Sequence, residues 1–235
     1  MLDLPVSLHT FFIITTAVFY VMFLFTMFKG SERVKKRMHM VILLLLAWLI
    51  FQSTLSLNGW YMDRKTVPPH VMFPLVVMVV MLGLMFGTGR GRRFVGGLND
   101  EMLTWLHIIR IPVEIALYLF ASQKALPWSM TFEGHNFDII FGITAPIIAI
   151  LAFRKKVISM KVVRIWNVLG LISVLIVVIT GIGAIPNLQW WDGSQPNYAV
   201  MHFPGIWLPS FIVPVVIFSH LAFITGTARS MKSEG

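Results

Sequence analysis

Cysteine is absent from this chain of 235 residues, and charged side chains are few. Without a thiol the chain cannot form disulfides, thiolate metal sites or iron–sulfur ligation, and it has no cysteine nucleophile. Charged residues make up 12% of the sequence, about half of what a soluble domain carries, whereas 57% of the residues are hydrophobic. These proportions predict an all-α, polytopic membrane protein whose main partner is the lipid bilayer.

Long apolar segments divide the sequence into candidate membrane helices. A spanning helix needs about 20 mostly apolar residues, and glycine, proline, serine and asparagine mark the turns between such segments. We expect one transmembrane domain over residues 1–235, a bundle of seven helices. Their predicted ranges are 7–28, 38–58, 70–88, 102–122, 137–153, 162–184 and 204–226.

Acidic residues are also scarce, ten against nineteen basic ones, which gives a net charge of +9. Such a balance occurs in nucleic-acid-binding proteins, but here fifteen basic residues gather in alternate loops and the tail, against three in the other loops. Cytoplasmic loops of membrane proteins carry the excess of lysine and arginine. The asymmetry predicts an outside N-terminus, a cytoplasmic C-terminus, a plasma or inner membrane, and no nucleic-acid partner.

Ionisable residues interrupt the apolar segment 102–122. His107, Arg110, Glu114 and Tyr118 recur at spacings of three and four, which places them on one face of a helix. Ionisable groups within a membrane are expensive, and they usually face a bundle interior or a wet cavity. Arg110 and Glu114 are four residues apart, so we expect them to neutralise each other.

Two further polar residues lie at a similar depth in other predicted helices. His107, Asn167 and His220 each lie about 8 Å from the same end of their segments, at a rise of about 1.5 Å per residue. We therefore expect the three to share one layer. The ligand-binding or proton-pathway residues predicted from the sequence are His107, Arg110, Glu114, Tyr118, Asn167 and His220. The alternative is a structural buried ion pair with two hydrogen-bonded histidines.

A second group of histidines and carboxylates falls near the outer helix ends. It comprises His9, His70, Glu133, His135, Asp138 and His202. These side chains are suitable ligands for a divalent metal. However, the spacing matches no familiar metal motif, and Asn136 and Asp138 also suit the cap and first turn of the predicted helix 137–153.

Two prosthetic groups can be considered from the histidines and lysines. An inner pair, His107 with His220, and an outer pair drawn from His9, His70 and His202 would allow haem, but no single predicted helix carries a histidine on each side of the bilayer. A retinal Schiff base is not expected, because the last predicted helix contains no lysine.

Three hypotheses for function follow. The first is a non-enzymatic membrane protein that binds or transports a small solute or protons through a cavity lined by the segment 102–122. The second, from another class, is a metal- or haem-dependent membrane enzyme. The third is a structural subunit of a membrane complex, in which the polar face of that segment contacts a partner helix.

Overall fold

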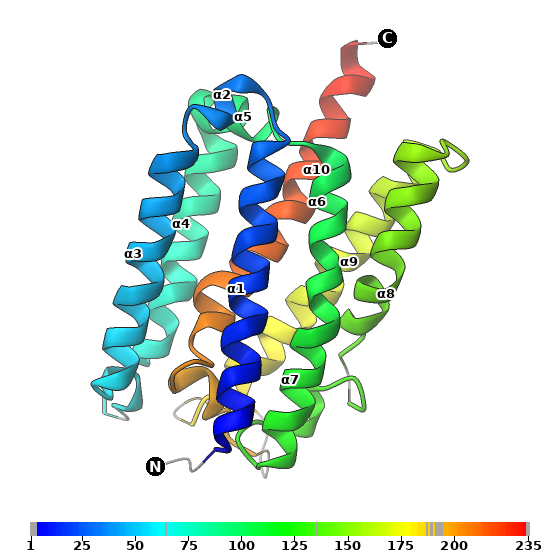
Figure 1. Cartoon of the computed structure of the whole chain (residues 1–235). Coiled ribbons are helices and arrows are strands. Elements are labelled where there is room, and N and C mark those ends of the chain that lie inside the picture. The colour runs from blue at the N-terminus through cyan, green and yellow to red at the C-terminus, as the bar shows by residue number, and fades with distance from the viewer. Residues whose placement is uncertain are drawn as a thin grey trace.

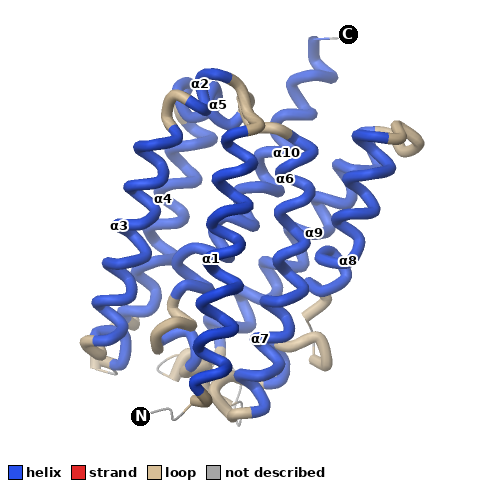
Figure 2. The backbone as a smooth tube through the Cα atoms, viewed as in Figure 1, coloured by secondary structure: helices blue, strands red, loops and turns tan. Residues whose placement is uncertain are grey.

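The structure is a computed structural model that describes residues 4–63, 65–134, 136–186, 188, 190 and 195–233, with side chains described as far as residue 226. All regular elements in these residues are helical (Figure 2). Six helices are long and apolar enough to cross a membrane, so the chain has the character of a multi-pass membrane protein. They are Val6–Phe28, Met38–Leu57, His70–Gly87, Asp100–Ser122, Met160–Gly183 and Leu208–Gly226.

The helices run alternately up and down, and the two termini lie at opposite ends of the bundle (Figure 1). Two short helices, α2 (Glu32–Lys35) and α5 (Gly89–Val95), lie together at one end, which we call the α2/α5 end; the other is the N-terminal end. The remaining helices are α1 (Val6–Phe28), α3 (Met38–Leu57), α4 (Phe73–Gly87), α6 (Asp100–Trp105), α7 (Arg110–Ser122), α8 (Asp138–Ala149), α9 (Met160–Gly183) and α10 (Val213–Ser233).

The predicted segment 137–153 is helical but shorter than the six long helices. It consists of α8 and a π-helical continuation, η5 (Ile150–Arg154). At about 1.5 Å per residue this continuous stretch extends about 26 Å, slightly less than the hydrocarbon thickness of about 30 Å. It packs against α7 and α9 and runs beside them (Figure 1).

The start of the last predicted helix was wrong. Helical structure begins with η7 (Leu208–Ile212), a π-helical turn that leads into α10, whereas Pro204 lies in a turn. The turn packs closely against the preceding short helix η6 (Ala199–Met201). A Cβ at Gly205 would lie only 2.1 Å from the Ala199 carbonyl oxygen. Glycine therefore permits a close backbone approach where the sequence predicted a helix start.

Prolines alter the helical geometry near the middle of the bundle. Pro112 follows a 3-10 stretch, η3 (Leu106–Ile109), which joins α6 to α7. A proline lacks the N–H that would bond the carbonyl four residues earlier, and its ring displaces that carbonyl. Pro214 frees the carbonyl of Ser210 in this way, and Trp48 Nε1 donates to that oxygen at 2.8 Å. Tertiary contacts thus satisfy a backbone group that the proline leaves unpaired.

The long helices differ in how much of their surface the rest of the protein covers. In an 18-residue apolar stretch of α6–α7 and another of Leu208–Gly226, 61% of the residues are buried, against 17% in the corresponding stretches of α3 and His70–Gly87. The two buried helices therefore form the centre of the bundle. His107, Arg110 and Glu114 of the segment 102–122 are directed into protein, whereas α3 and α4 leave most of their apolar side chains uncovered.

Candidate functional site: a buried polar cluster

A group of polar side chains lies in the interior between α6–α7, α8, α9 and α10. All its members are almost fully buried, with at most 7% of each residue exposed. We call this group the buried polar cluster. Its members are His107, Arg110, Glu114, Asn136, Asp138, Asn167, Ser173, Ser219 and His220.

Two imidazoles stack at the level nearest the α2/α5 end. The rings of His107 and His220 have centroids 3.9 Å apart and planes inclined by 20°. Asn167 donates from Nδ2 to the Val163 carbonyl, so its Oδ1 accepts from His220 Nδ1 at 2.8 Å. Ser219 donates its hydroxyl hydrogen to the Val216 carbonyl, so it accepts from His107 Nε2 at 3.1 Å.

These contacts assign the tautomers of both histidines in their neutral form. His220 carries its hydrogen on Nδ1 and His107 on Nε2. The remaining ring nitrogens, His107 Nδ1 and His220 Nε2, are buried and have no hydrogen-bond partner. A neutral imidazole nitrogen without hydrogen is an acceptor. Each histidine therefore holds one free lone pair in the protein interior.

A small residue and an indole shape the space around the histidines. A Cβ at Gly170 would lie 2.5 Å from His220 Cε1, so only glycine allows this imidazole to lie against α9. The Trp166 ring contacts both imidazoles, with centroid distances of 5.4 Å to His107 and 5.9 Å to His220. Its Nε1 donates to Thr144 Oγ1 at 2.9 Å, which fixes the indole between α8 and α9.

Arg110 occupies the middle of the cluster and is paired across helices. Its Nη2 lies 3.3 Å from Asp138 Oδ2 and donates to the Gly170 carbonyl at 3.0 Å. The guanidinium also lies over the Phe141 ring, 5.3 Å from its centroid. Nε and Nη1 of Arg110 have no hydrogen-bond partner. Two of the three guanidinium nitrogens are therefore available to another polar group.

The expected ion pair between Arg110 and Glu114 does not form; among the described residues, the acidic partner of Arg110 is Asp138. The reason lies in the neighbouring segment. Asn136 donates from Nδ2 to Glu114 Oε1 at 2.6 Å, which holds the Glu114 carboxylate, while Ser173 donates to Asp138 Oδ1. Asp138 thereby presents its other oxygen to Arg110.

Asn136 connects the cluster to the start of α8. Its Oδ1 accepts from the Asp138 backbone N–H at 2.9 Å, and this N–H has no partner within the helix. Asn136 therefore caps the start of α8 from one residue before the N-cap position, which Phe137 occupies. Its Nδ2 also donates to the Met130 carbonyl at 2.9 Å. Glu114 Oε2 remains without a hydrogen-bond partner.

The cluster contains one guanidinium, two carboxyl groups and two imidazoles. With both carboxyl groups ionised and both imidazoles neutral, its formal charge is −1, so a single added proton makes it neutral. Buried polar atoms are normally paired with protein or ordered water. Four residues here retain unpaired buried atoms: His107, Arg110, Glu114 and His220. The arrangement has the composition to bind and exchange a proton.

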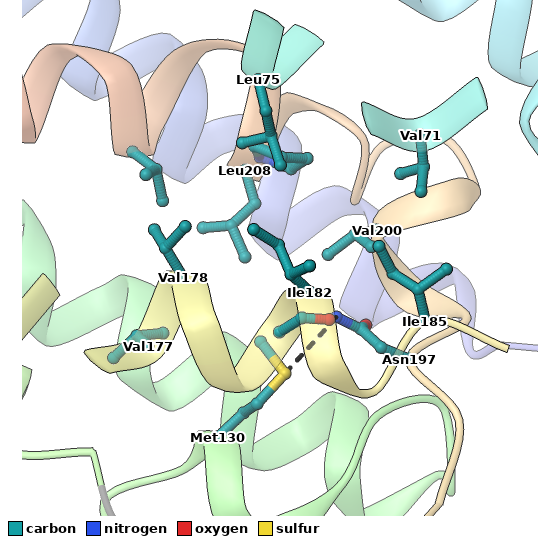
Figure 3. A pocket seen from close by; sticks show the side chains of 13 residues that line it. Val71, Leu75, Met130, Val177, Val178, Ile182, Ile185, Asn197, Val200 and Leu208 are labelled. Atoms are coloured by element: carbon teal, nitrogen blue, oxygen red, sulfur yellow. Dashed lines mark hydrogen bonds between the residues drawn. The ribbon is translucent and has the colours of Figure 1, made fainter. Parts of the chain in front are cut away.

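A small cavity is lined by residues of α9, of η7 and the start of α10, and of the His70–Gly87 helix, together with Met130 and Asn197 (Figure 3). Its volume is about 50 Å³, and its lining is apolar except for Asn197. Asn197 Nδ2 lies 3.4 Å from Met130 Sδ, and Asn197 Oδ1 has no hydrogen-bond partner. The same Met130 accepts from Asn136 through its carbonyl. Hydrogen bonds of Asn136 to the Met130 carbonyl and to Glu114 thus connect the cavity lining to the cluster.

Other residues predicted for the site lie elsewhere. Tyr118, on the face of α7 that carries Glu114, stacks on Phe132 at 5.3 Å and contacts Trp128 at 5.4 Å. It is only partly buried, and its ring contacts Trp128 and Phe132 in the connection that follows α7. Tyr118 therefore belongs to the aromatic surface at the N-terminal end and not to the buried polar cluster.

The second group of histidines and carboxylates is dispersed. Asp138 belongs to the buried polar cluster, Glu133 is exposed, and His135 lies outside the described residues. His70 stacks on Trp60 at 4.1 Å, and His202 bonds the Tyr198 carbonyl through Nδ1. His9 is half-buried. In the part of the chain that the structure describes, no three histidine or acidic residues come close enough to hold a metal ion.

The inner histidine pair also does not match an axial ligand pair for haem. The rings of His107 and His220 contact each other directly at 3.9 Å. Two axial ligands of one iron lie on opposite faces of the macrocycle, and no macrocycle fits between rings in contact. In stacked rings the in-plane nitrogens do not point at each other, so proton exchange between the two imidazoles requires a bridging water or a ring rotation.

Comparison with known proteins assigns the chain to a group but provides no activity. The sequence model of one family, described as "Domain of unknown function (DUF8737)", matches residues 66–226. This range includes every member of the buried polar cluster. No curated protein and no solved structure matches the chain.

Proposed function

The chain belongs to this family, whose description states no function, and we propose that it is a multi-pass membrane protein that carries protons through the buried polar cluster. One observation supports the proposal most strongly: five ionisable side chains are buried in one cluster, and four of the five keep unpaired polar atoms. Ionisable groups at such depth mark ion or proton pathways more often than structural contacts.

The order of the groups supports a route along α6–α7. Glu114, Arg110 and His107 span seven residues, which corresponds to about 10 Å along the helix axis. In the proposed route a proton enters from the small cavity beside Asn197 and reaches Glu114. It then passes Arg110 and Asp138 and leaves through the paired imidazoles toward the α2/α5 end.

The size of the cavity favours a proton over a larger solute. A volume of about 50 Å³ accommodates one or two water molecules and excludes most solutes. The free lone pairs of His107 and His220 accept protons directly, and the unpaired Arg110 donors suit a bound water. Because the cluster is enclosed by four helices of the same chain, it does not fit the role of a contact surface for a partner helix.

The proposal includes seven spans, with α8 and η5 as the fifth, and a cytoplasmic α2/α5 end in a plasma or inner membrane. An odd number of passes agrees with termini at opposite ends (Figure 1). The loops at the α2/α5 end carry the basic excess, which is retained in the cytoplasm. The shorter fifth helix requires a small tilt of its neighbours or local thinning of the bilayer.

Cysteine labelling tests this orientation, because the chain has no native cysteine. Single variants Glu32→Cys and Val157→Cys, at exposed positions of the α2/α5 end, should resist an impermeant thiol reagent in intact cells and react after lysis. Val67→Cys and Glu133→Cys, exposed at the N-terminal end, should react in intact cells. The reversed pattern, or labelling of all four in intact cells, would refute the proposed orientation.

Proton flux tests the function itself. Purified protein is reconstituted into liposomes that contain a pH-sensitive dye, and a potassium diffusion potential drives proton entry. The protein should acidify the lumen faster than protein-free liposomes do. His220→Gln keeps a donor toward Asn167 but removes the free imidazole nitrogen, and it should slow the flux on the order of 10-fold.

The matched control is His70→Gln, which alters a histidine that stacks on Trp60 outside the cluster. It should leave the flux unchanged. If wild-type protein gives no flux above protein-free liposomes, or if the two histidine variants behave alike, the proposed proton pathway is wrong.

A further inference from the structure

A large apolar groove lies between α3 and α4, separate from the buried polar cluster. Its volume is about 520 Å³, within the range of about 300–1,000 Å³ that is typical of small-ligand sites. Its floor is formed by η7 and α10, with Phe211 and Phe218 among the lining side chains. Helices α3 and α4 are the least covered long helices, so the groove faces the surrounding lipid.

The groove is closed toward the N-terminal end and continues to the α2/α5 end. At the closed end the Phe73 ring contacts Trp48 at 5.9 Å and Phe51 at 6.3 Å, which joins α3 to α4. Trp48 is fixed by its hydrogen bond to the Ser210 carbonyl. At the α2/α5 end the lining residues include Arg37 and Arg90. An amphiphile that enters the groove therefore meets aromatic rings at one end and positive charge at the other.

The dimensions correspond to one leaflet of a bilayer. From Arg37 to Trp48 the chain advances eleven residues along α3, which is about 16 Å. Half of the hydrocarbon thickness is about 15 Å. An acyl chain whose headgroup lies at the level of Arg37 would thus reach the aromatic end. Methionines line the walls at Met40, Met78, Met81 and Met85, and their flexible side chains adapt to chains of different shape.

Arg37 and Arg90 are both exposed. In the described residues, neither side chain takes part in a salt bridge. Both belong to the connections that flank the groove: Arg37 directly precedes α3, and Arg90 lies in the first turn of α5, directly after α4. Guanidinium groups bind phosphate oxygens through charge-assisted hydrogen bonds. Thr88 also lines the groove at this end, but its hydroxyl caps α5, where it donates to the Leu84 carbonyl and accepts from the Gly91 N–H.

We propose that this groove is a specific site for one anionic phospholipid of the leaflet at the α2/α5 end. Its phosphate lies between Arg37 and Arg90, and one acyl chain lies along α3 and α4 as far as Trp48. Two observations together support this proposal: the apolar groove is about as long as one leaflet is thick, and two arginines lie at its α2/α5 end. The lipid site and the proton pathway are independent, and either can hold without the other.

Native mass spectrometry of the full-length protein tests the proposal, with phosphatidylglycerol and phosphatidylcholine of identical acyl chains as probes. Wild-type protein should retain one phosphatidylglycerol molecule in preference to phosphatidylcholine. Arg37→Gln/Arg90→Gln should weaken phosphatidylglycerol binding about 30-fold, since each basic residue near a membrane surface contributes about a fivefold effect. The matched control is Arg33→Gln/Arg93→Gln, which removes the same charge from exposed residues of α2 and α5 that do not line the groove.

A second pair of variants tests the acyl-chain channel. Val77→Trp fills the groove and should reduce binding of both lipids at least tenfold, whereas Val79→Trp, on the exposed side of α4, should not. Equal losses in the two arginine double variants would overturn the proposal, because they indicate unspecific charge attraction. Equal binding by the two tryptophan variants would also overturn it. So would a homodimer or a bound protein in place of a lipid.

Discussion

Arg110→Met should lower the free energy of unfolding in detergent by about 3–5 kcal/mol, the usual cost of breaking a buried ion pair. The substitution removes the cation next to Asp138 and the donor to the Gly170 carbonyl, and it leaves a buried carboxylate between α7 and α9. Chemical or thermal unfolding of the purified protein measures the loss.

A double-mutant cycle identifies the partner of Arg110. Arg110→Met/Asp138→Leu should recover much of the stability, because replacing both members of a buried pair by apolar residues is often nearly neutral. Arg110→Met/Glu114→Leu should show much weaker coupling, since Glu114 is held by Asn136. The reverse result, strong coupling to Glu114 and none to Asp138, would contradict the ion pair seen in the structure.

An exposed ion pair, Arg154 with Glu101, serves as the control for the loss of stability in Arg110→Met. Arg154 Nε lies 2.8 Å from Glu101 Oε1, and the Arg154 side chain is 59% exposed. Exposed pairs contribute about 0–1 kcal/mol, so Arg154→Met should change stability little. Comparable losses from Arg154→Met and Arg110→Met would mean that burial does not strengthen the inner pair.

The sequence was a good guide to the helices because length and hydropathy determine membrane spans almost directly. Six of the predicted segments are helices of spanning length in the part of the chain that is described. The short helices α2 and α5 were not predicted, since four to seven residues carry too little periodicity to detect. The start of the last helix was misplaced because Pro204 suits a first helical turn equally well as a loop.

The cluster was partly predictable for a different reason. The structure places His107, Arg110 and Glu114 on one face of α6–α7, as helical periodicity requires. It also brings Asn167 and His220 to the level of His107. Depth along a helix can be counted from sequence, whereas the rotation of each helix toward its neighbours cannot.

The partners of these residues were harder to foresee. Asp138 and Asn136 were assigned to a cap and a possible metal group, since their positions at a helix start gave no sign of contact with Arg110 and Glu114. Ser173, Ser219 and Gly170 were not singled out at all. Their only signal is that they are small or polar residues in apolar helices, a common feature of membrane-helix packing.

Glu114→Gln should reduce proton flux in liposomes on the order of 100-fold, the larger of the two flux effects expected here. Glutamine keeps an oxygen that accepts from Asn136, so the local hydrogen bonding survives. It removes the carboxylate oxygen that is buried without a partner, Oε2, and with it the group that takes up a proton beside the small cavity. The flux assay with the internal pH-sensitive dye measures the effect directly.

The control for Glu114→Gln is Glu133→Gln, which makes the same chemical change at an exposed position near the N-terminal end. It should retain wild-type flux, and both variants should remain as stable to unfolding as the wild type within about 1 kcal/mol, because neither strands a new buried charge. If Glu114→Gln conducts protons at the wild-type rate while His220→Gln does not, Glu114 is not the entry group and the route must begin at Asp138. If both conduct normally, the buried polar cluster is structural, and its unpaired atoms are satisfied by trapped water.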